Sequence, residues 1–158
     1  VRGEPLPKYR PKTRTLEQER GVFVTIKKQG RLRGCIGYIR PTKPLYEAVP
    51  DMAVTASTGD PRFPPVALNE LGDLKIEISV LTPLKRIEDP KEIQVGRDGI
   101  YIVKGLYSGL LLPQVATEYG WDRMTFLEET CHKAGLPPDA WKQDATIYTF
   151  SAQIFSEE

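Results

Sequence analysis

The sequence predicts an α+β protein built on antiparallel strands. Segments in which apolar and polar residues alternate are joined by short turns, which is typical of antiparallel pairing. Helical patterns stand between these segments, without the regular strand–helix–strand alternation of a doubly wound parallel sheet. The chain has 158 residues, of which 40% are hydrophobic, so it suits one domain or two small lobes with an ordinary core.

Two strands joined by a turn are predicted near the start of the chain. A proline-rich, basic arm, residues 1–14, comes first and is expected to lie extended on the surface. Residues 21–27 and 32–39 then alternate apolar and polar side chains around Gln29-Gly30, a pair that favours a turn. These segments therefore predict a β-hairpin.

A helix and a third strand are predicted next. Apolar residues recur at helical spacing after Pro44, which is expected to open the helix, and Pro50 is expected to kink it. The prolines of residues 60–65 exclude helix and central strand, so they predict a rigid loop. Residues 74–81 alternate strictly and predict a strand.

The second half of the chain predicts a shorter hairpin, residues 99–104 and 109–112, followed by two helices. The first helix covers residues 113–119. The second covers residues 123–134 and follows Asp122, which can cap it.

Two further segments complete the prediction. Gly96-Arg97-Asp98-Gly99 has the spacing of a nucleic-acid-binding loop, but it stands beside a hairpin, so a turn is the better interpretation. Residues 146–155 predict one final strand. Because this strand shares the period-two pattern of the strands in the first half, we expect it to join them in a single sheet.

The overall charge argues against nucleic acid as a main partner. Lys and Arg total 22 and Asp and Glu total 21, a net charge of +1, which gives little attraction for phosphate backbones. No apolar run approaches the roughly 20 residues that a membrane span needs. The two cysteines stand far apart, so we expect reduced thiols in a cytoplasmic protein. No cofactor is expected. The sequence also has no phosphate-binding Gly-rich loop with Lys-Ser/Thr.

The segment Leu32-Arg33-Gly34-Cys35-Ile36-Gly37 resembles the signature of the AMMECR domain family, whose microbial members are also called AmmeMemoRadiSam system protein A. The similarity extends well past this signature, and several ordered motifs together are more specific than any one of them. The further matching segments are residues 21–25, 60–66, 77–83, 109–116 and 120–121.

The resemblance implies a fold of two unequal lobes. Residues 1–83 with 140–158 would form the larger lobe, residues 84–139 the smaller inserted one, and the signature strand would face a cleft between them. Family members usually carry an amphipathic helix before the first strand, where this chain has its proline-rich arm. The family's activity is not established, and its microbial name implies a partnership with a Memo-like protein and a radical-SAM enzyme.

Cys35 is the first candidate for chemistry. A reactive thiolate needs a nearby positive charge, and Arg33 is expected on the same strand face. Glu77 is expected on the polar side of its strand, where it could pair with Arg33. Cys35, Arg33 and Glu77 are therefore the candidate catalytic residues. The structural alternatives stay open: an inert, packed cysteine and an ordinary ion pair.

Four other residues are candidates for binding. Arg62 stands in the proline-rich loop, where it could contact an anion or form a salt bridge that pins the loop. Gln114 stands at the start of a helix, where backbone N–H groups are free. Gly34 and Gly37 flank the cysteine and allow a close approach of backbone or substrate.

A metal site is not expected. Cys35, Cys131 and His132, the only histidine, lack the short paired spacings by which metal sites are recognised. Two functional interpretations remain open. The chain is either a domain whose cleft binds a protein, a peptide or a metabolite, or an enzyme or enzyme subunit that uses Cys35 as a thiol nucleophile.

Overall fold

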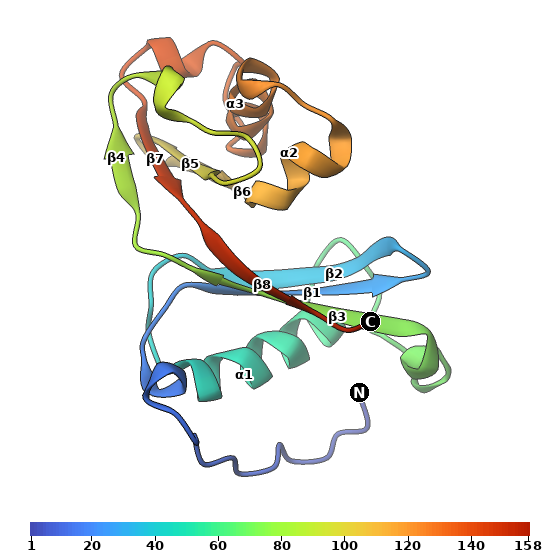
Figure 1. The fold of residues 1–158 in the computed structure, drawn as a ribbon. Coiled ribbons are helices and arrows are strands. Elements are labelled where there is room, and N and C mark those ends of the chain that lie inside the picture. Colours follow the sequence, from blue (N-terminus) through green and yellow to red (C-terminus); the bar gives the residue numbers. More distant parts are fainter. The chain divides into compact units, whose positions relative to one another are not determined.

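The structure is a computed structural model that describes residues 1–158. The chain divides into two compact units, Val1–Leu81 with Gln153–Glu158 (the first unit) and Thr82–Ala152 (the second unit). Each unit combines one four-stranded antiparallel sheet with helices (Figure 1). The predicted α+β class is confirmed. The predicted lobes, with boundaries at residues 84 and 139, and the cleft between them stay predictions.

The sheet of the first unit has the strand order β2-β1-β3-β8, and helix α1 lies along one face of it (Figure 1). The predicted hairpin is confirmed, since β1 and β2 pair antiparallel, and β3 pairs with the other side of β1. The apolar residues Val22 and Val24 of β1 are fully buried. The bounds are Arg14–Glu17 for η1, Val22–Lys28 for β1, Arg31–Tyr38 for β2, Leu45–Thr58 for α1, Leu68–Asp73 for η2, Leu74–Leu81 for β3 and Ala152–Ser156 for β8.

The sheet of the second unit has the order β4-β7-β5-β6, and α2 and α3 pack against its strands. Asp122 caps α3 as predicted, because its Oδ1 accepts the Thr125 N–H at 2.8 Å. The core gathers Ile100 and Ile102 from the sheet and Phe126 from α3. The bounds are Lys85–Ile87 for β4, Pro90–Glu92 for η3, Gly99–Lys104 for β5, Tyr107–Leu111 for β6, Pro113–Tyr119 for α2, Arg123–Lys133 for α3, Ala140–Lys142 for η4 and Thr146–Phe150 for β7.

The prediction of one final strand in the first sheet is wrong for half of its length. Residues 146–150 form β7, which pairs with β4 and β5 in the second sheet, and only β8 belongs to the first sheet. The ladder is interrupted at Ser151, whose backbone C=O and N–H bond to the Thr82 N–H and hydroxyl, both at 2.9 Å. Ile147 is buried in the core of the second unit, which explains why β7 stays there.

No helix of the structure has the length and apolar character to cross a bilayer.

Candidate functional site

The signature hexapeptide lies on β2, an edge strand of the first sheet. Its side chains alternate between the two faces. Ile36 pairs with Val24 and shares the face that α1 covers, while Cys35 pairs with Thr25 on the opposite face. The structure therefore places the candidate thiol on the face away from the helix.

Cys35 is held at each of its polar groups. Its backbone N–H donates to Asp60 Oδ2 at 2.9 Å, and its C=O accepts from Arg62 Nη2 at 3.1 Å. Its Sγ accepts the hydroxyl hydrogen of Thr25 at 3.2 Å, and the residue is only partly buried. Asp60 and Arg62 therefore hold the backbone of Cys35, and the Thr25 hydroxyl orients its sulfur.

The Asp60–Arg62 pair supplies two of these contacts. Arg62 donates to Asp60 from Nε and Nη2, at 2.9 and 2.7 Å, and the Asp60 side chain is only 2% exposed. The hydrogen bonds from Arg62 hold the pKa of Asp60 well below its usual range despite burial. The pKa of Arg62 is raised, chiefly by the Asp60 carboxylate and to a smaller extent by the charge of Cys35. Arg62 therefore forms the salt bridge that pins its loop, which was the alternative to an anion contact. It also lies close to the thiol.

Arg33 bonds neither the Cys35 thiol nor Glu77, but a different set of partners. Its guanidinium donates to both oxygens of Glu70, at 3.1 and 2.9 Å, and to the backbone C=O groups of Pro64 and Pro65 at 2.9 and 3.3 Å. These hydrogen bonds hold the pKa of Glu70 well below its usual range. Arg33 thus fastens the proline-rich loop to β2.

Glu77 lies on the thiol-bearing face, but two strands away from β2. It pairs with Thr25 across the β1–β3 ladder, so β1 separates it from Cys35. Its Oε2 accepts from Lys27 Nζ at 3.3 Å and from the Ser156 hydroxyl at 3.2 Å. Cys35, Thr25 and Glu77 therefore form one polar row across three strands.

Gly34 and Gly37 are required by close packing. A Cβ on Gly34 would lie 2.2 Å from the backbone O of Ala56 in α1, and one on Gly37 would lie 2.1 Å from the backbone O of Val22. These glycines make room for neighbouring parts of the same unit. The close approach predicted from the sequence is thus made by the chain itself.

Gln114, the second cysteine and the only histidine belong to the second unit. Gln114 is the second residue of α2, so it does not share a compact unit with Cys35. Cys131 is fully buried, and burial raises the pKa of its thiol. His132 is exposed and pairs with Glu129 at 3.3 Å.

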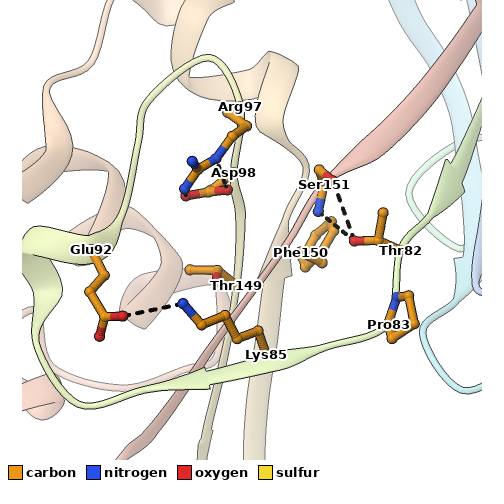
Figure 2. A pocket seen from close by; sticks show the side chains of 9 residues that line it. All are labelled: Thr82, Pro83, Lys85, Glu92, Arg97, Asp98, Thr149, Phe150 and Ser151. Carbon is orange, nitrogen blue, oxygen red and sulfur yellow. Dashed lines mark hydrogen bonds and ion pairs between the residues drawn. The ribbon is translucent and has the colours of Figure 1, made fainter.

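A hollow in the second unit was not predicted from the sequence. Its volume is about 290 Å³. The lining comes from the start of β4 and the residues before it, from η3, from the turn before β5, and from the end of β7 with Ser151 after it (Figure 2). Its lining residues are Thr82, Pro83, Lys85, Glu92, Arg97, Asp98, Thr149, Phe150 and Ser151.

The sequence also carried a signal for Asp60, which the prediction missed. Asp60 and Arg62 flank Pro61 in a loop that prolines stiffen, so an acid and a base stand two residues apart with restricted freedom to separate. Thr25 and Glu70 carried no comparable signal, because their contacts depend on strand register and on a distant turn.

Comparisons with known proteins agree with the resemblance. A family model described as AMMECR1 matches residues 1–155. Protein MK0488 of Methanopyrus kandleri is 54% identical over 94% of this chain and 77% of its own length. Protein PF1979 of Pyrococcus furiosus is 52% identical over 90% of this chain and 73% of its own length. A crystal structure of PH0010 from Pyrococcus horikoshii, described as an uncharacterized protein, superposes with a TM-score of 0.94 at 48% identity, covering 99% of this chain and 83% of that one.

Proposed function

The chain belongs to the AMMECR1 family, and on that premise we propose that it is a ligand-binding domain whose ligand contacts the Cys35 thiol. The contacts made by Cys35 are the main support for this proposal. An inert packed cysteine needs no partners at its sulfur, but this one is partly exposed and oriented by Thr25. A fixed polar group with partial access to solvent is typical of a recognition site.

The polar row gives the site its recognition chemistry. It offers a thiol, a hydroxyl and a carboxylate paired with the Lys27 ammonium, which together can donate and accept hydrogen bonds. A metabolite or a peptide has groups that suit such a row. Binding is favoured over catalysis because the carboxylate in the polar row, Glu77, is engaged by the Lys27 ammonium and so is not free to act as a general base for the thiol.

Thiol chemistry is the second candidate, and one observation favours it. The Arg62 guanidinium lies close enough to Cys35 for the charge of the thiolate to raise the pKa of Arg62. A nearby cation stabilises a thiolate, which is the nucleophilic form. In this alternative the thiolate adds to the carbon of a carbonyl group. The C–S bond forms as the C=O π bond breaks, and the oxygen takes that electron pair and then a proton from water, which leaves a covalent adduct on the chain.

A protection experiment tests the binding proposal. The full chain is treated with iodoacetamide in the presence of fractionated cell metabolites, and labelling of each cysteine is followed by mass spectrometry. We expect a fraction that slows labelling of Cys35 and raises the Tm of the natural chain, but not that of the Cys35→Ala variant. A Cys35 that labels only on unfolding would contradict the proposal, whereas an intact-mass adduct that survives denaturation would favour the nucleophile instead.

Partners and location are part of the same proposal. The Memo-like protein and the radical-SAM enzyme that the family name implies remain predicted partners, and a cytoplasmic location also remains a prediction. Size-exclusion chromatography of this chain with a Memo-like protein from the same organism tests the first of these. Elution as separate peaks at micromolar concentration would count against a stable pair.

A further inference from the structure

We propose that the hollow of the second unit is a binding site for a phosphate group, either inorganic phosphate or the phosphate of a small ester. This site lies in the second unit and does not depend on the role of Cys35. Its volume of about 290 Å³ is near the lower limit for ligand pockets, so it suits a small ligand.

Thr149 provides the first argument. It lies on β7 and lines the hollow (Figure 2), and only 6% of its surface is exposed. Its backbone is paired with β4 and β5, but its hydroxyl has no hydrogen-bond partner within the chain. The hydroxyl is not among the enclosed polar atoms that lack a partner, so it is open to the hollow and can donate a hydrogen bond to a ligand there.

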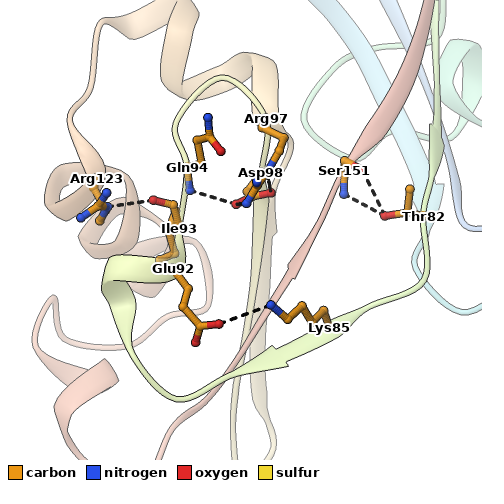
Figure 3. A network of polar contacts seen from close by, with 9 residues as sticks. All are labelled: Thr82, Lys85, Glu92, Ile93, Gln94, Arg97, Asp98, Arg123 and Ser151. Atoms are coloured by element: carbon orange, nitrogen blue, oxygen red, sulfur yellow. Dashed lines mark hydrogen bonds and ion pairs between the residues drawn. The ribbon is translucent and has the colours of Figure 1, made fainter.

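Arg97 provides the second argument. Its Nε and Nη2 donate to Asp98 Oδ1 and Oδ2, both at 2.8 Å, and the Gln94 N–H donates to Oδ2 at 2.9 Å (Figure 3). Burial acts to raise the pKa of Asp98, but the hydrogen bonds from Arg97 and Gln94 outweigh it and the pKa is lowered. Asp98 therefore stays ionised and orients the guanidinium. The Nη1 hydrogens of Arg97, whose side chain is 58% exposed, remain free to bind an anion.

Lys85 supplies a second cation from the other side of the hollow. It contacts Glu92 at 3.3 Å, and both side chains are exposed, at 71% and 43%. Exposed pairs of this kind are weak and easily exchanged. A phosphate can therefore take the place of Glu92 beside Lys85 while Glu92 turns into solvent.

The chemical class of the ligand follows from these groups. Arg97, Lys85 and Thr149 can all donate hydrogen bonds, and the buried carboxylate of Asp98 already accepts three. The donors lie around one hollow and two of them are positively charged, which suits the three peripheral oxygens of a phosphate better than the two of a carboxylate. The Ser151 hydroxyl, which makes only a long 3.4 Å contact to Thr82, can add a fourth donor.

Titration of the full chain with inorganic phosphate tests this proposal. Backbone amide shifts are followed by NMR, with sodium chloride at equal ionic strength as the control. We expect saturable shifts centred on residues 82–85, 94–98 and 149–151, and the same pattern with glycerol phosphate if the site takes phosphate esters. Saturation by phosphate alone would assign the site to the free anion. Acetate that binds as tightly as phosphate, or shifts that never saturate, would overturn the proposal.

Three variants identify the groups that bind. Arg97→Gln and Thr149→Val should each weaken phosphate binding about tenfold or more, as expected for hydrogen bonds to a charged ligand. Lys85→Gln should weaken it more than Lys91→Gln, which removes the same charge from an exposed residue that does not line the hollow. Thr149→Val should not lower the Tm without phosphate, because it removes a hydroxyl that has no partner in the chain. Equal losses for the two lysine variants would show non-specific attraction and contradict the site.

Discussion

The Asp60 carboxylate replaces a neighbouring strand for Cys35: its Oδ2 accepts the outward N–H of this edge-strand residue at 2.9 Å. Arg62, which Asp60 holds, donates to the C=O of the same residue at 3.1 Å. Edge strands expose unpaired backbone groups that invite pairing with other chains. This pair of side chains covers the edge at the signature cysteine.

Loss of the Asp60 carboxylate should destabilise the chain. Asp60→Ala leaves the Cys35 N–H and the Arg62 guanidinium without their partner, and we expect the free energy of unfolding to fall by about 2–3 kcal/mol. Asp51→Ala is the matched control. Asp51 of α1 pairs with Lys43, and both side chains are exposed, so losing this pair should lower the free energy of unfolding far less. Urea denaturation measures both. Equal losses for the two variants would show that the edge contact adds no stability.

Stability should also fall in acid. The pKa values of Asp60 and Glu70 are both lowered in the folded chain. Unfolded chains bind protons at these groups near pH 4, so below about pH 5 the unfolded state holds more protons and becomes favoured. The contribution of both groups is therefore complete above that pH and is lost as the pH falls. Denaturation between pH 7 and pH 3 should show a shallower decline for Asp60→Asn, and an unchanged slope would refute the assignment.

Alanine should not be tolerated at the signature glycines. Gly34→Ala and Gly37→Ala would place a Cβ about 2 Å from backbone oxygens, so strands or helix must move apart, at a cost of about 1–3 kcal/mol. Gly72→Ala is the control, because nothing lies within 4 Å of its Cβ position and its φ is not positive. We expect that change to be neutral or slightly stabilising. The melting temperatures of the three variants are compared with that of the natural chain. A Gly34→Ala variant as stable as the natural chain would contradict the packing described.

The sequence predicted the parts of the fold that depend on local pattern. The first hairpin and β3 follow from alternating residues, and the Asp122 cap follows from its position before a helix. The break at Ser151 was not predictable, because residues 146–155 keep one alternating pattern and only the bonds to Thr82 interrupt the ladder. The three-residue strand β4 is also too short to leave a pattern.

The residues of the candidate site stay a prediction, but the structure shows that their pairings differ from those expected. Arg33 was expected to serve the thiol, yet its guanidinium bonds Glu70 and two prolyl carbonyls, while Arg62 reaches Cys35 from the loop. Which arginine meets which acid depends on how residues 60–70 fold back along β2. That path is set by tertiary contacts and leaves no periodic signal.

The central claim is that Cys35 is an accessible and oriented thiol, and comparing the alkylation rates of the two cysteines tests it most directly. Cys131 is an internal control in the same chain, because it is fully buried and burial raises the pKa of its thiol. Iodoacetamide should label Cys35 in the folded chain and Cys131 only on unfolding. Thr25→Val should slow labelling of Cys35 several-fold, since it removes the hydroxyl that donates to Sγ, and should leave Cys131 unchanged. Equal, slow labelling of both cysteines in the natural chain would contradict the account.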